Sequence, residues 1–252
     1  MRKIWDLAEN TFRETIRDRV LNVSLLFALA MLGASVLLGT LSIGQDQKIV
    51  RDLGLAAIEF FGVAIAIFIG TSLLYRELDQ RTVFIVLAKP VARHSFLLGK
   101  FCGLVATLTV LLALMTLAYV VLLLALRAFE LPLLWAVALL WVELLLLVGL
   151  SLMFSTFASP VLALVYTFSL YLTGNNLDGL KALARNARPL VKVLAEGAYY
   201  LLPNLGHLNI KNQVVYGAPF SLGQWGLALA YGGCYTAFVL LLAVGIFARR
   251  EF

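Results

Sequence analysis

RELDQRTVFIVLAKPVARHSFLLGK, residues 76–100, is the most charge-dense internal stretch of the chain and lies between two long apolar segments. Glu77 and Arg81 are four residues apart, so they face each other on a helix. An apolar patch follows, and Pro90 ends a helix that begins before it. The stretch therefore predicts a short, partly polar helix at a membrane surface, after which Arg93 leads into the next apolar segment.

The composition is that of an integral membrane protein. Hydrophobic residues make up 62% of the 252 residues and charged residues 13%, whereas soluble domains average about 25% charged residues. Spans and short connections account for the whole length, which leaves no room for a soluble catalytic domain. The net charge of +6 fits basic residues beside membrane spans and anionic lipid, with no nucleic-acid partner. The charged N-terminus is not expected to be a cleaved signal.

Six apolar segments are candidates for membrane spans, because a bilayer needs about 20 apolar residues in a helix. The predicted spans are 20–42, 54–75, 95–126, 131–157, a short one after 159–160 that ends near 174, and 222–248. A short polar connection is expected over 43–53. Six spans put both termini on one side, and basic residues near the span ends favour the cytoplasm. The predicted fold class is all-α integral membrane, with one domain.

Amphipathic segments flank the spans. Residues 1–19 are predicted to form an interfacial helix that lies flat on the membrane, 20–174 the first five spans, 175–223 an extracytoplasmic amphipathic segment, and 224–252 the last span and a cytoplasmic tail. The N-terminal helix has apolar residues at helical spacing, namely Ile4, Trp5, Ala8, Phe12 and Ile16. In the long outer segment, the basic residues Lys181, Arg185, Arg188 and Lys192 oppose an apolar stripe, and Pro189 either kinks this helix or opens a second one.

Two acidic residues fall within predicted spans. Glu143 is near the middle of the fourth span, where an acidic residue costs roughly 2.5–3.5 kcal/mol to insert. It is therefore expected to face inward. Its role is left open between lining a substrate path or dimer interface and a structural hydrogen bond to a neighbouring span. Glu59 is nearer the end of its span, and an ordinary position near the headgroups is the simpler interpretation.

Several chemical functions find no support in the sequence. No Gly-x-x-x-x-Gly-Lys-Ser/Thr loop is present, so the chain is not expected to bind ATP in the P-loop manner. His94 and His207 lie in different loops, and no cluster has metal-ligand spacing. Cys102 and Cys234 lie in apolar spans and are expected to be buried thiols. No cofactor, metal or catalytic residue is predicted in this chain.

The 76–100 stretch resembles the first cytoplasmic loop of ABC-2 type exporter permeases. The resemblance rests on Glu-x-x-x-Arg-Thr, the apolar patch, Lys-Pro, a basic residue and Leu-Gly-Lys. It extends to the span count and to the motifs Leu-Pro-Asn-Leu, Asn-x-Lys-Asn and Tyr-Gly before the last span, over nearly the whole chain. Within that superfamily the chain resembles the branch of multi-copper-enzyme maturation permeases.

The resemblance implies a coupling helix between the second and third spans that docks on a separate ATPase. The residues carried over to this contact are Glu77, Asp79, Arg81, Thr82, Pro90 and Arg93. ATP and Mg would then bind the partner ATPase. The N-terminal helix would lie beside that ATPase, or else serve only as a lipid anchor.

The sequence and the resemblance together predict a permease subunit of a dimeric ABC exporter in the bacterial inner membrane. A second copy or a homologue would complete the pore. The alternative is a membrane anchor that transmits ATPase motion to a periplasmic partner without moving a solute. The basic outer segment is either a lid on the outer leaflet or a docking surface for such a partner.

Overall fold

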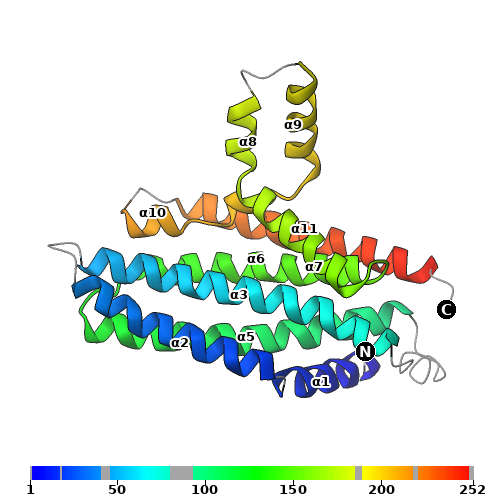
Figure 1. The fold of residues 1–252 in the computed structure, drawn as a ribbon, viewed down its shortest axis with the longest axis horizontal. Coiled ribbons are helices and arrows are strands. Elements are labelled where there is room, and N and C mark those ends of the chain that lie inside the picture. The colour runs from blue at the N-terminus through cyan, green and yellow to red at the C-terminus, as the bar shows by residue number, and fades with distance from the viewer. Residues whose placement is uncertain are drawn as a thin grey trace.

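The computed structural model describes residues 2–17, 19–40, 46–79, 93–184, 189–217 and 221–249. All regular elements in these ranges are helices (Figure 1). They are α1 (Arg2–Ile16), α2 (Arg19–Thr40), α3 (Asp46–Asp79), α5 (Arg93–Ala125), α6 (Pro132–Ser155), α7 (Pro160–Asn175), α8 (Leu177–Ala184), α9 (Pro189–Leu201), the 3₁₀ turn η1 (Leu205–His207), α10 (Lys211–Val215) and α11 (Leu222–Arg249). The prediction of an all-α fold is confirmed.

Within the described residues, four helices are long and apolar enough to cross a bilayer, at Gln47–Leu73, His94–Ala125, Pro132–Ser155 and Leu222–Arg249. They run side by side along the long axis of the molecule, with α6 packed against α3, α5, α7 and α11 (Figure 1). The described apolar part of α2 is the shorter stretch Leu25–Leu37, and α7 has 16 residues. Their assignment as the first and fifth spans stays a prediction.

Helix α3 begins well before the apolar segment that was predicted to be the second span. It starts at Asp46 and continues for 34 residues, or about 51 Å at the helical rise. The prediction of a polar connection is therefore wrong for residues 46–53. The polar residues there mark the end of the membrane core and not the end of the helix, since a hydrocarbon core is only about 30 Å thick.

Arg51 explains why this polar extension of α3 is ordered. Its Nε donates to the carbonyl oxygen of Ala128 at 2.7 Å, and its Nη1 lies 2.5 Å from Glu130 Oε1. The hydroxyl of Tyr119 donates to the carbonyl of Arg51 at 2.8 Å. Gly54 permits this packing, because a Cβ there would lie 2.2 Å from the Tyr119 ring. The contacts hold α3 against the turn between α5 and α6.

Replacing Arg51 with leucine is expected to lower the free energy of unfolding by about 2 kcal/mol, because the carbonyl of fully buried Ala128 loses its charged donor. The control Glu130→Gln is expected to cost under about 1 kcal/mol, since the Glu130 side chain is 47% exposed. Chemical denaturation in detergent micelles measures both. Equal losses would mean that the ion pair, and not the hydrogen bond to the turn, stabilises this end of α3.

The N-terminal helix packs along the first turns of α5. Gly99 and Gly103 make the close approach possible, because Cβ atoms there would lie 2.7 Å from Leu7 Cβ and 2.5 Å from Thr11 Cβ. Helix α1 buries Ala8, Thr11 and Thr15. Trp5 was placed on the apolar face but is 73% exposed. The Gly-x-x-x-Gly motif therefore packs α1 against α5. An exposed Trp5 on the chain without lipid agrees with the predicted membrane-facing surface of α1, which stays a prediction.

Helices α8 and α9 form a hairpin that projects from the long helices (Figure 1). Pro189 is the first residue of α9. Of the two predicted alternatives, it therefore opens a second helix and does not kink a single one. The Lys181 ammonium lies 3.8 Å from the centroid of the Tyr199 ring, which joins the two helices. Lys192 is exposed, and Arg185 and Arg188 lie outside the described residues.

The two cysteines differ from the prediction. Cys102 on α5 and Cys234 on α11 are both exposed on the isolated chain. Helices α5 and α11 are apolar on every face. An apolar sequence around a cysteine therefore does not show whether its side chain packs against other helices.

Candidate functional site

Two carboxylates are buried among the long helices. Glu59 on α3 is 7% exposed and Glu143 on α6 is 1% exposed. Glu59 thus differs from its simpler interpretation, because protein groups and not the headgroup region surround its carboxylate. An acidic side chain in such surroundings requires charged or hydrogen-bonding partners, and the structure supplies them from three other parts of the chain.

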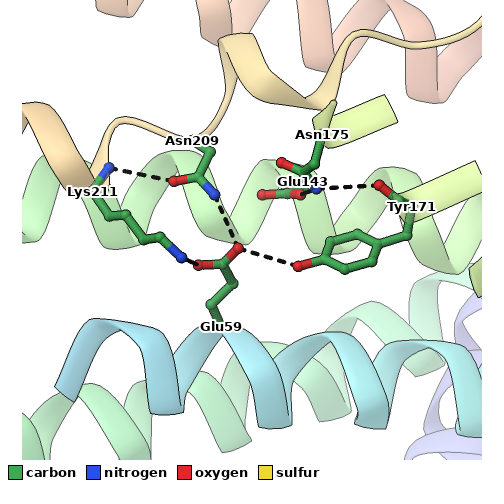
Figure 2. A network of polar contacts seen from close by, with 6 residues as sticks. All are labelled: Glu59, Glu143, Tyr171, Asn175, Asn209 and Lys211. Carbon is green, nitrogen blue, oxygen red and sulfur yellow. Dashed lines mark hydrogen bonds and ion pairs between the residues drawn. The ribbon is translucent and has the colours of Figure 1, made fainter. Parts of the chain in front are cut away.

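Glu59 receives three polar contacts (Figure 2). The Lys211 ammonium, at the start of α10, lies 2.5 Å from Oε2. The Asn209 amide donates to Oε1 at 2.9 Å, and the Tyr171 hydroxyl of α7 donates to the same oxygen at 3.2 Å. Charge-assisted hydrogen bonds of this kind are stronger than neutral ones. The carboxylate of Glu59 therefore joins α3 to α7 and to the segment that precedes α11.

Glu143 belongs to the same network through Asn175, the last residue of α7. The Asn175 amide donates to Glu143 Oε1 at 3.0 Å and lies 3.4 Å from the Tyr171 carbonyl oxygen (Figure 2). Of the two roles that were left open for Glu143, the structure thus contains the hydrogen bond across a helix interface. A path-lining or dimer-interface role stays a prediction.

A small cavity lies between the two carboxylates. Its volume is about 20 Å³, and polar residues in its wall are Glu59, Glu143, Asn209 and Lys211. Such a volume holds one water molecule when polar partners surround it. The six residues of Figure 2 form what we call the carboxylate network: Glu59, Glu143, Tyr171, Asn175, Asn209 and Lys211.

The carboxylate network can hold helices together but contains no catalytic arrangement. Its acidic groups are satisfied by one amine, two amides and one phenol. Within the described part of the chain, no three His, Cys, Asp or Glu side chains gather as a metal site would require. These residues connect α3 and α6 to α7 and to the segment before α11 through polar contacts.

Among the residues predicted to contact an ATPase, those that the structure describes lie at the end of α3 and at the start of α5. Glu77 and Asp79 are in the last turn of α3 and Arg93 is the first residue of α5. Arg81, Thr82 and Pro90, with the predicted coupling helix, lie outside the described residues. The backbone of α3 therefore connects this segment directly to Glu59.

Sequence analysis missed four members of the carboxylate network: Tyr171, Asn175, Asn209 and Lys211. Asn209 and Lys211 belong to the Asn-x-Lys-Asn motif. The motif was therefore noticed in the sequence, but no role was assigned to its residues. Lys211 is 152 residues from Glu59 along the chain, and no periodic pattern links residues so far apart. The only clue to these partners in the sequence was that an ionisable residue within a span requires a charged or hydrogen-bonding partner.

A model of the family described as ABC-2 family transporter protein matches residues 5–251 of the chain. A comparison with curated proteins gives no match. The family match covers the long helices, the carboxylate network and the segment between α3 and α5. Because it spans nearly the entire sequence, the resemblance is confirmed and this chain belongs to the ABC-2 family of transporter proteins.

Proposed function

We propose that the protein is the permease subunit of an ATP-driven exporter, with a separate ABC ATPase that binds ATP and Mg. It would reside in the bacterial inner membrane with both termini in the cytoplasm. A second copy or a homologue would complete the pore. Cycles of ATP binding would displace the 76–93 segment and shift the long helices between inward-open and outward-open states.

The observation that carries this proposal is the continuity of α3. Its last turn contains Glu77 and Asp79, the first residues of the predicted ATPase contact, and the same helix carries Glu59. The 20 residues from Glu59 to Asp79 span about 30 Å of helix. A continuous helix moves as one body, so a push at its end would reach the carboxylate network and strain its contacts with α7 and α10.

The arrangement of the chain ends supports the proposed topology. The start of α1 and the end of α11 lie at the same end of the molecule, together with the end of α3 (Figure 1). An even number of spans produces this arrangement. It would place α1 and the end of α3 on one side, where a cytoplasmic ATPase could contact both.

Exposed apolar side chains support a partner within the membrane. On α2, Leu26 and Leu37 are 67% and 70% exposed, and on α7, Val161 is 71% exposed. In a membrane, lipid or the second permease copy would cover such surfaces. We expect the second copy to cover part of these apolar side chains.

The α8–α9 hairpin favours a second candidate function. It projects from the long helices (Figure 1), as a surface for an extracytoplasmic partner would. In this alternative the chain transmits ATPase motion to that partner and no solute crosses. A polar stripe along the interface of the two permease copies would favour transport, whereas a sealed apolar interface with an occupied hairpin would favour mechanical transmission.

Reversing the charge of Glu77 is expected to abolish co-purification of the chain with its candidate P-loop ATPase. Glu77→Arg places a positive charge at the end of α3, where the proposed contact begins, and like or unmatched charges at an interface weaken association by several kcal/mol. The measurement is a pull-down of the solubilised chain. Glu196→Arg, the same reversal on exposed α9, is the control and should retain the ATPase. A well-folded chain that never retains an ATPase would contradict the proposed function.

A further inference from the structure

A pocket of about 600 Å³ lies apart from the carboxylate network, between α6, the start of α8, η1, α10 and α11. Its polar wall consists of Asp178, His207, Gln213, Gln224, Trp225 and Tyr231, and its apolar floor includes Leu139 and Ile210. Small-molecule sites typically measure about 300–1,000 Å³ and combine an apolar lining with a few placed polar groups. The pocket has both the size and the composition of such a site.

Asn204 positions three of the polar groups. It is 5% exposed. Its side-chain amide lies 3.4 Å from Asp178 Oδ1 and 3.3 Å from His207 Nε2, and its backbone nitrogen donates to the Tyr231 hydroxyl at 2.8 Å. A buried amide that holds a carboxylate, an imidazole and a phenol in one wall gives the pocket a fixed shape.

The charged side chains in and near the pocket determine which ligands it can attract. The Asn204 amide nitrogen can only donate, so His207 Nε2 is the acceptor in this contact. Two nearby ammonium groups are directed elsewhere: that of Lys181 lies over the Tyr199 ring, and that of Lys211 pairs with Glu59. Asp178 is the one acidic side chain among the residues that line the pocket, and no Lys or Arg is among them.

Further oxygen atoms add negative partial charge. Asn204 Oδ1 is buried without a hydrogen-bond partner among the described residues. A Cβ on pocket-lining Gly206 would lie 3.1 Å from that oxygen and 3.6 Å from the carbonyl oxygen of Asn175. A carboxylate also accepts more than the one bond that Asn204 donates to Asp178. The remaining acceptor capacity of pocket-lining Asp178, with the partial charge of the oxygens behind Gly206, favours a ligand that brings positive charge.

We propose that this pocket binds an organic monocation, either a protonated amine or a quaternary ammonium group. Asp178 supplies the opposite charge. The rings of Tyr231 and Trp225 supply aromatic surface of the kind that attracts ammonium groups. Gln213 and Gln224 are exposed and line the rim, where their amides can bond polar groups of the ligand. The ammonium group belongs either to a soluble molecule or to the headgroup of a lipid.

The test uses the full chain in nanodiscs of phosphatidylglycerol, with benzyltrimethylammonium as the probe and calorimetry as the readout. Binding to the wild type is expected to be saturable, and Asp178→Asn is expected to raise Kd by about tenfold or more, because it removes the charge without changing the shape. Glu196→Gln removes one negative charge from exposed α9, outside the pocket, and should leave Kd unchanged. Gln224→Glu adds a charge at the rim and should lower Kd.

Three outcomes would overturn the proposal: no saturable binding to the wild type, equal weakening by Asp178→Asn and Glu196→Gln, or equally tight binding of benzenesulfonate. Adding phosphatidylethanolamine to the nanodiscs distinguishes the two sources of the ammonium group. Competition with the probe would identify a lipid headgroup, and its absence a soluble amine. Because the ATPase takes no part, the result is independent of the proposed transport function.

Discussion

Replacing Lys211 with methionine is expected to lower the free energy of unfolding by about 3 kcal/mol, because it leaves the buried Glu59 carboxylate without its ammonium partner. The loss falls at the lower end of the range for broken buried pairs, since Asn209 and Tyr171 still donate to Glu59. Methionine preserves most of the side-chain length, so the change is mainly electrostatic. Thermal and chemical unfolding of the solubilised protein measure the effect.

A double-mutant cycle separates the ion pair from its surroundings. Glu59→Met alone removes the carboxylate, and Glu59→Met with Lys211→Met removes both partners of the pair. We expect the double variant to be more stable than Lys211→Met, because replacing both partners by apolar groups is often nearly neutral, whereas an unpaired buried charge is costly. Additive losses would show that Glu59 and Lys211 do not act as a pair.

Replacing Gly103 with valine is expected to detach α1 from α5. A Cβ at this position would lie 2.6 Å from the carbonyl oxygen of Ala8, and backbone atoms cannot move aside as a flexible side chain can. We expect a loss of about 2–3 kcal/mol, as for other overpacked interfaces. Chemical denaturation in detergent micelles measures the loss.

The matched control is Gly245→Val on α11, where a Cβ would meet nothing within 4 Å. It makes the same substitution in a long apolar helix and should leave the free energy of unfolding unchanged. If Gly103→Val behaved like this control, the close contact between α1 and α5 would not contribute to stability.

Much of the helical fold is predictable because apolar runs of this length have few alternatives in a membrane. Residues 95–126 and 131–157 correspond closely to α5 and α6. The start of α3 was misplaced because hydropathy reports the membrane boundary, and Arg51 extends the helix past it through contacts with Ala128 and Glu130. Such a tertiary contact leaves no periodic signal near residue 46.

The candidate site was predictable only in part. A carboxylate at position 143 indicates an inward-facing group through its insertion cost alone. Its partner Asn175 is on another helix, and the partners of Glu59 come from α7 and from the segment before α11. The hairpin illustrates the same limit. Pro189 predicted either a kink or the start of a second helix, and the stacking of Lys181 on Tyr199 depends on how the two helices meet.

The separation of Glu59 and Lys211 along the chain has a consequence for biogenesis. Ribosomes add roughly 5–20 residues per second, so the 152 residues between them take on the order of 8–30 s to synthesise. During that interval the insertion machinery accepts α3 with its acidic residue while its basic partner does not yet exist. The nascent protein therefore passes through a stage in which Glu59 has none of its polar partners, and the carboxylate network can be completed only when the final third of the polypeptide emerges.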